Sequence, residues 1–152
     1  MPSLEVMAAI SRNRYSPLTN YGILKPMTAT TATPQLILVA GPYRSNTGDD
    51  PQKITQNLRL MNEVALELFR LGHVPVTGEA LAFPLIQLAG SKQLGDAPFN
   101  EIFHPLARRL IGRIDAVIRV GGPSAGADEM ITLARAAGKT VYGVVAEVPP
   151  GS

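Results

Sequence analysis

Residues 36–40, Leu-Ile-Leu-Val-Ala, form an unbroken apolar run that ends at Gly41 and Pro42. A short apolar run of this kind is typical of a strand buried in a parallel sheet. Three further runs predict strands at residues 73–77, 115–120 and 140–145. Pro75 lacks an amide donor, so the strand at 73–77 is expected at an edge of the sheet.

Amphipathic segments separate the four predicted strands. Asp50 and Pro51 are typical of a helix start, and Gly72 is typical of a helix end. Between them the apolar residues recur at the spacing of one helix face: Ile54, Leu58, Met61, Ala65 and Leu68. Further helices are expected near residues 80–88, from Pro98 to Gly112, and from a glycine-rich turn to Ala137. The alternation of strands and helices predicts a doubly wound α/β fold, a parallel sheet with helices on both faces.

The composition fits a single domain with an extra arm. The chain has 152 residues, enough for one buried core. Residues 1–34 show no sustained period and end in a stretch rich in threonine, alanine and proline. They are expected to form an N-terminal arm or linker before a domain at residues 35–148. Charged residues make up 17% of the chain, below the usual ~25%, which predicts that a second copy covers part of the surface in a homo-oligomer.

Charge and residue counts exclude several classes of function. A net charge of +2 disfavours binding of a nucleic acid polymer through bulk charge. The absence of cysteine excludes disulfides, thiolate metal sites and cysteine nucleophiles, and only two histidines, far apart, predict no metal site. No apolar run reaches the ~18–20 residues of a membrane span, and the first residues lack a signal-peptide pattern. No membrane association and a cytoplasmic location are therefore expected.

Two loops are expected to form a ligand site. They follow the first and third predicted strands, at residues 41–46 and 121–129. Ligands bind outside the carboxyl ends of parallel strands, and these two loops are neighbours if the strand order is 2-1-3-4. The second loop leads into a helix N-terminus, which favours an anion; alternatively, its glycines only make a tight turn capped by Ser124. The candidate binding residues are Gly41, Pro42, Tyr43, Arg44, Gly122, Ser124, Gly126, Ala127 and Asp128.

The glycine-rich turn matches no common nucleotide-binding motif. Gly121, Gly122 and Gly126 do not have the spacing of a dinucleotide fingerprint. No Gly-Lys-Ser/Thr follows them, so the turn is no Walker A loop either. NAD and ATP are therefore disfavoured, and no cofactor is expected.

Five segments together carry a resemblance to a known family. They are LILVAGPYRSN (36–46), LGHVPVTG (71–78), RIDAVIRVGG (113–122), SAGADEM (124–130) and AAGKTVYGV (136–144). Over residues 35–146 the chain resembles the nucleoside 2-deoxyribosyltransferase superfamily, most closely its small bacterial and phage branches. The resemblance implies a flavodoxin-like, Rossmann-like fold and cleavage or transfer of the N-glycosidic bond of nucleosides or nucleotides. It also implies a loop tyrosine, a serine with backbone amides, and a glutamate nucleophile on the helix after the glycine-rich loop.

The resemblance assigns roles to particular positions of this chain. Tyr43 matches the loop tyrosine, and Ser124 with Gly126 match the anion-binding turn. The nucleophile's position holds Met130, and the position of a helper aspartate holds Ala107. Glu129, one residue early and rotated by ~100° on a helix, is then the first candidate nucleophile.

Several residues keep two interpretations. Glu79 is the second candidate nucleophile, although a residue in its place is more often a solvated loop charge. Asp128 could protonate the departing base or only stabilise the helix start. Arg44 could pair with a phosphate or be exposed, and His104 could face the cleft or only pack. The aromatic residues Phe69, Phe99 and Phe103 favour a core role over a base-stacking one.

Three functions follow from these observations. The leading one is binding of a nucleoside or nucleotide with hydrolysis or transfer of its N-glycosidic bond, which makes the chain an enzyme. The first alternative is a catalytically inactive module that binds the same ligand, which Met130 and Ala107 favour. The second is an oligomeric interaction protein without a small ligand, which the low charge favours.

Overall fold

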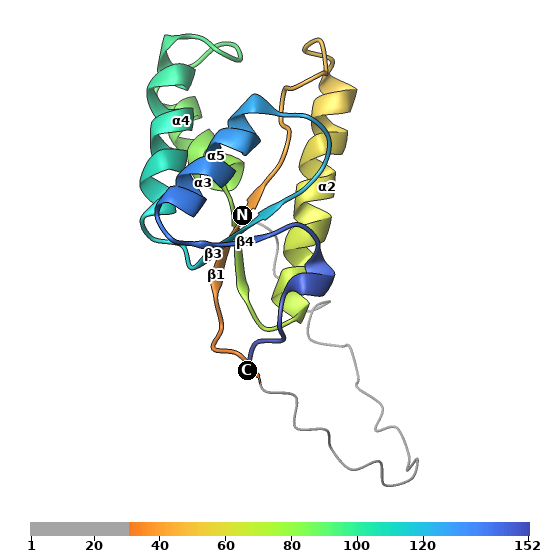
Figure 1. Cartoon of the computed structure of the whole chain (residues 1–152). Helices are drawn as coiled ribbons and strands as arrows, with labels where there is room; N and C mark the ends of the chain where they lie inside the picture. The colour runs from red at the N-terminus through yellow and green to blue at the C-terminus, as the bar shows by residue number, and fades with distance from the viewer. Residues whose placement is uncertain (1–30) are drawn as a thin grey trace, which may run out of the picture.

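The apolar run at 36–40 is strand β1 (Leu36–Ala40), and it lies inside a four-stranded sheet in the computed structural model, which describes residues 31–152 (Figure 1). The other strands are β2 (Val74–Thr77), β3 (Ala116–Arg119) and β4 (Thr140–Tyr142). All pairs are parallel and the order is β2-β1-β3-β4. This arrangement confirms the predicted doubly wound, flavodoxin-like sheet and places the proline-containing strand at an edge.

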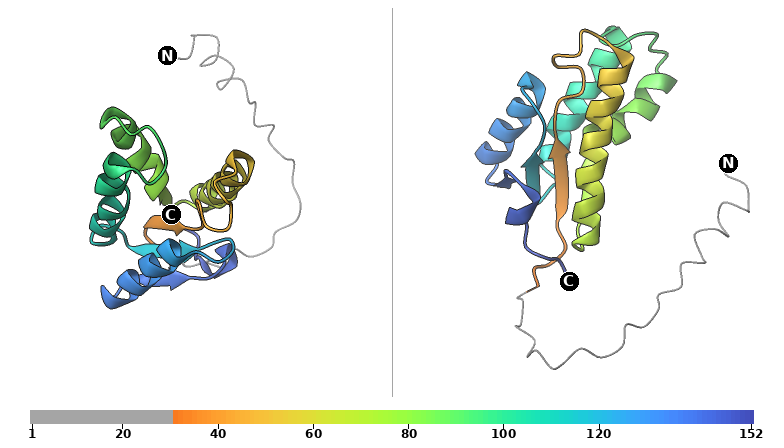
Figure 2. Two further views of the ribbon diagram at one scale, coloured as in Figure 1. Left: turned by 90° about the horizontal axis from the view of Figure 1, so that it is seen from above. Right: turned by 90° about the vertical axis from the view of Figure 1, so that its right-hand side faces the viewer.

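Helices cover both faces of the sheet. They are α2 (Pro51–Arg70), α3 (Gly78–Leu88), α4 (Ala97–Ile111) and α5 (Ala125–Ala136), followed by the short 3-10 helix η1 (Val145–Glu147). Ile37 and Val39 pack on α2, whereas Leu38 packs on α5, because successive side chains of a strand point to opposite faces. Figure 2 shows α2 and α5 on opposite sides of β1.

The predicted helix boundaries are confirmed at three caps. The Asp50 side chain accepts a hydrogen bond from the N–H of Gln52 at 2.9 Å, and Pro51 opens α2. Ser124 caps α5 in the same way, by accepting from the N–H of Ala127 at 3.2 Å. Gly72 follows α2 with a φ of +93°, a backbone conformation that favours glycine.

Two predictions about the ends of elements are wrong. The fourth apolar run was predicted as a strand to residue 145, but β4 ends at Tyr142. Its ladder with β3 ends there too, and the N–H of Gly143 donates to Oε2 of Glu147 in η1 at 2.7 Å instead of extending the ladder. Phe69 was predicted in the core but is 66% exposed, since it lies on the outer side of α2. Of the predicted arm, residues 1–30 lie outside the described residues, and Ala32 pairs with Gly151.

Candidate functional site

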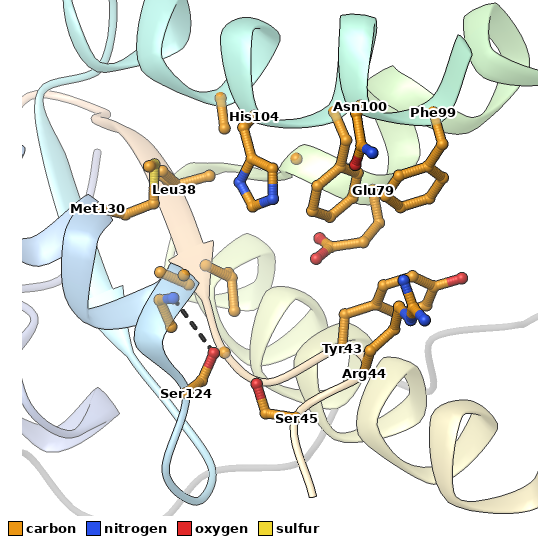
Figure 3. A pocket seen from close by; sticks show the side chains of 18 of the residues that line it. Leu38, Tyr43, Arg44, Ser45, Glu79, Phe99, Asn100, His104, Ser124 and Met130 are labelled. Atoms are coloured by element: carbon orange, nitrogen blue, oxygen red, sulfur yellow. Dashed lines mark hydrogen bonds between the residues drawn. The ribbon is translucent and has the colours of Figure 1, made fainter. Parts of the chain in front are cut away.

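A cavity of about 490 Å³ opens at the carboxyl edge of the sheet, where parallel α/β folds bind ligands (Figure 3). Its floor is the end of β1 and the loop to α2, and its walls are the start of α3, one side of α4 and the first turn of α5. The predicted binding residues that line it are Gly41, Tyr43, Arg44, Ser124, Gly126 and Ala127. The two loops that the sequence singled out therefore meet at one site.

Direct contacts hold the two loops together. Gly121 has a φ of +74°, and a Cβ placed on it would lie 2.7 Å from Cδ of Pro42. The Nδ2 of Asn46 donates to the carbonyl of Pro123 at 3.4 Å. Pro42 and Gly122 do not line the cavity. Pro42 belongs to this loop packing, whereas Gly122 has open space around the position of a Cβ.

The first loop is fixed from within. The hydroxyl of Thr47, a buried side chain, donates to the carbonyl of Arg44 at 2.6 Å and accepts from the N–H of Asp49 at 3.2 Å. Asn57 of α2 donates from Nδ2 to the carbonyl of Tyr43 at 3.1 Å. These bonds hold the backbone so that the Tyr43 and Arg44 side chains both line the cavity (Figure 3).

Arg44 has a carboxylate partner of its own. Its Nε and Nη2 both donate to Oδ1 of Asp49, at 3.0 and 2.8 Å. The two charges cancel at the cavity wall, so the guanidinium is already engaged before any phosphate could bind it. The Arg44 side chain is 34% exposed, so it is neither unpaired nor fully exposed, and a phosphate partner for it stays a prediction.

Glu79 is the carboxylate that faces the cavity. Thr77 ends β2 and caps α3 by accepting from the N–H of Ala80 at 3.2 Å, which places Glu79 in the first helical turn without an intervening loop. Glu79 is only 8% exposed, so its interpretation as a solvated loop charge is wrong. Its carboxylate points into the cavity (Figure 3). Burial raises the pKa of this carboxyl, and its own backbone N–H offsets part of the effect.

The first candidate nucleophile lies elsewhere. Glu129 is not a lining residue and accepts hydrogen bonds from Nε and Nη2 of Arg108 at 3.1 and 2.7 Å. Asp128 is exposed and pairs with Nε of Arg119 at 2.9 Å. Met130 does line the cavity. The rotation of ~100° between neighbouring helix positions separates the two sides.

Aromatic rings form one wall of the site. Tyr43 lies 5.0 Å from Phe83 and 5.9 Å from Phe103, and Phe103 lies 4.9 Å from Phe99, measured between ring centroids. Phe99 belongs to the core as predicted, yet Phe99 and Phe103 also line the cavity. Burial raises the pKa of Tyr43, and the charge of Glu79 raises it further.

Sequence reasoning undervalued two side chains of α4. His104 was assigned mainly a packing role, but it lines the cavity near Gly126. Asn100, one turn earlier, also lines the cavity, although it belongs to no recognisable motif. The sequence sign that could have linked them is their spacing of four residues on a predicted helix, because this spacing places both side chains on one face.

Metal-binding and membrane-spanning features were searched over the described part of the chain. Within residues 31–152 no group of three or more metal-ligating side chains gathers. No helix in that range combines the length and apolar character needed to cross a bilayer.

The cavity combines one buried carboxylate, one imidazole and an aromatic wall. These groups can bind a flat ring and move a proton at an adjacent atom. No protein-family model matches the chain, and no curated protein matches it either.

Proposed function

We propose that the cavity binds a nucleoside-like ligand and cleaves its N-glycosidic bond, with Glu79 as the catalytic carboxylate. The observation that carries the proposal is the Glu79 side chain, 8% exposed and pointing into a cavity with an aromatic wall. A buried carboxylate destabilises a fold unless it is paired, and none of the ion pairs within residues 31–152 includes Glu79. A group of this kind is typical of a functional site.

The dimensions and the resemblance support the same ligand class. The cavity volume of about 490 Å³ lies in the usual range for small-molecule sites of ~300–1,000 Å³. The resemblance to nucleoside 2-deoxyribosyltransferases implies a ligand between a loop tyrosine and the start of the helix after the glycine-rich turn. Tyr43 and Gly126 are the corresponding residues, and both line the cavity.

The chemistry assigned to Glu79 follows from the transition state. When the C1′–N bond breaks, C1′ develops positive charge, which a nearby carboxylate stabilises. In hydrolysis, the Glu79 carboxylate removes a proton from the water that attacks C1′, and the bond's electron pair leaves with the base. In transfer, an acceptor takes the place of water. Because Met130 replaces the glutamate of the family, the carboxylate comes from α3 in this chain.

Release of free base tests the proposal. Mass spectrometry of the protein incubated with a nucleoside panel should detect free base, and Glu79→Gln should lower the rate by at least about 100-fold. Glu129→Gln is the matched control, because Glu129 pairs with Arg108 outside the lining. The assignment is wrong if Glu129→Gln abolishes release and Glu79→Gln does not.

A module that binds the ligand without catalysis is the second candidate. Ala107 and Met130 both line the cavity at positions where the resemblance implies carboxylates, and this observation favours the loss of catalysis. Under this alternative, thermal shift would detect nucleoside binding while no base is released. If no nucleoside of the panel binds, both candidate functions are excluded. The remaining function is then that of an oligomeric interaction protein without a small ligand.

A further inference from the structure

The wall of the cavity carries one uncompensated charge. Its ionisable lining side chains come from the first loop, α3 and α4: Tyr43, Arg44, Asp49, Glu79 and His104. Arg44 and Asp49 form a 2.8 Å ion pair and cancel. Every other Arg and Lys of residues 31–152 lies outside the lining. When ionised, the Glu79 carboxylate is the charge that no ion pair compensates.

This negative charge lies beside aromatic rings. The Glu79 carboxylate lies in the cavity between Tyr43 and Phe99 (Figure 3), and its charge contributes to the raised pKa of Tyr43. The rings of Tyr43, Phe99 and Phe103 line the cavity with centroid separations of 4.9–5.9 Å between neighbours. The faces of aromatic rings attract cations, and a buried carboxylate attracts them more strongly. The same carboxylate repels an anion.

Resting on the proposed function, we infer that the substrates are unphosphorylated nucleosides whose base is a cationic heteroaromatic ring, such as a pyridinium. The ring would stack on the wall formed by Tyr43 and Phe103, with its charge facing Glu79. No lysine lines the cavity, and the one lining guanidinium, that of Arg44, is already shared with the Asp49 carboxylate, so a 5′-phosphate would have to share it too.

A cationic base also explains how one carboxylate is sufficient. A neutral base must be protonated as it leaves, which calls for a second acid. A cationic ring needs no proton, because the electron pair of the C1′–N bond moves onto the ring nitrogen and neutralises it. Water adds to C1′, its proton passes to Glu79 and then to solvent, and the products are a neutral base, a free sugar and one proton. The alanine at position 107, where the resemblance implies a helper carboxylate, then costs the reaction nothing.

Nicotinamide riboside and its dihydro form separate charge from shape, because the two differ by one hydride and only the first is cationic. Calorimetry should show at least about tenfold tighter binding of nicotinamide riboside to the wild type, measured before turnover. Glu79→Gln should abolish that preference, while Glu129→Gln should retain it. Equal affinity of the wild type for the two forms would overturn the inference.

Nicotinamide mononucleotide adds a 5′-phosphate to the same cation. The wild type should bind it at least about tenfold more weakly than the riboside. Asp49→Asn should narrow this gap because it releases Arg44, and asparagine tolerates the φ of +60° at that position. Tighter binding of the mononucleotide by the wild type would overturn the inference.

Cleavage is measured separately from binding, so that failure of the proposed function can be distinguished from failure of the inferred substrate class. Each kcat/KM is divided by the uncatalysed rate of the same nucleoside at the same pH. The ratio should be at least about tenfold higher for nicotinamide riboside than for adenosine. Equal ratios would retain the proposed function and overturn the inference. Absence of cleavage with the cation preference intact would overturn the proposed hydrolysis and retain the ligand class.

Discussion

Glu79 is a buried carboxylate at the start of a helix. It occupies the first turn of α3, where a carboxylate is normally stabilised by the helix dipole and by water. Here burial removes most of the water, and the pKa of the carboxyl rises. A fold that keeps such a group gives up some stability in exchange for a reactive carboxylate in the cavity.

Glu79→Gln should stabilise the protein at pH 7. The folded-state pKa of Glu79 is raised, so its carboxyl binds protons more tightly in the folded than in the unfolded chain, and wild-type stability falls as pH rises through that pKa. Glutamine escapes this loss, and a gain of about 0.5–2 kcal/mol is typical of such replacements. Urea unfolding at pH 7 and pH 4 checks it, because the gain should shrink at pH 4. A loss of stability at pH 7 would contradict the account.

Activity should fall as the pH is lowered, and the midpoint of this fall should lie above the ordinary pKa of a glutamate. The proposed catalysis requires the ionised Glu79 carboxylate, and burial raises the pKa of this group above its ordinary value of 4.5. The other ionisable groups lining the cavity are Tyr43, Arg44 and Asp49 in the first loop and His104 on α4. A profile of kcat/KM between pH 4 and 8 measures the acid limb. The His104→Asn variant should show the same acid limb in its kcat/KM profile. If the acid limb disappeared in this variant, it would belong to the imidazole of His104.

At the scale of elements, the site depends on how two loops fit together. The loop after β3 must pass close to Pro42 in the loop after β1, and Gly121 makes this possible with a φ of +74°. The neighbouring Gly122 has open space around the position of a Cβ. Two adjacent glycines therefore have different structural demands.

Gly121→Ala should destabilise the protein and weaken ligand binding together. A Cβ at this position would lie 2.7 Å from Cδ of Pro42, so both loops would have to shift. We expect a loss of about 1–3 kcal/mol in the free energy of unfolding, whereas Gly122→Ala should stay within about 0.5 kcal/mol. Urea unfolding and calorimetry with nicotinamide riboside measure both effects. Equal behaviour of the two variants would show that the loop contact does not position the site.

The elements were predictable from the sequence because their signals are local. The apolar run of β1, the Asp50 and Ser124 caps and the edge position of β2 each follow from a few neighbouring residues. The end of β4 was not predictable, since the N–H of Gly143 bonds to the side chain of Glu147 instead of continuing the ladder with β3.

The burial of Glu79 was missed for the same reason. The sequence marks the end of a strand at Thr77, but only the packing of α3 on α4 makes the carboxylate face a cavity. Residues 80–88 carry no charge, but only Ala82 and Ile86 among them are buried, so this local sign does not separate the packed face of α3 from its exposed one.

The two ends of the sheet differ in structure. The carboxyl end opens into the cavity, and the amino end is closed by the final residues of the described chain (Figure 2). His73 makes this closure: its Nδ1 accepts from the N–H of Gln35 at 3.0 Å, and its Nε2 lies 2.7 Å from the carbonyl of Pro149. The side chain is 2% exposed, so water does not replace these partners readily.

Removal of residues 1–30 tests the predicted homo-oligomer. A chain that begins at Thr31 keeps the pairing of Ala32 with Gly151 and removes the undescribed residues 1–30. If the arm joins two copies, light scattering should give half the mass, or less, that it gives for the whole chain. An unchanged number of subunits would show that the arm does not join them.

The two histidines allow a test of this division between stability and function. His73→Ala leaves the N–H of Gln35 and the carbonyl of Pro149 without their partner at the amino end, and we expect a loss of roughly 2–4 kcal/mol in the free energy of unfolding. His104→Ala removes a cavity side chain and should cost less than about 1 kcal/mol in stability, but at least about fivefold in affinity for nicotinamide riboside. Because His73 lies at the end of the sheet away from the cavity, its variant should bind the riboside with wild-type affinity at temperatures where it stays folded. Urea unfolding and calorimetry on the same two variants measure both quantities. If the folded His73→Ala protein bound the riboside fivefold more weakly, the closure of the amino end would also shape the cavity. Its effect would then reach the ligand through β1 and β2, because these two strands begin beside His73.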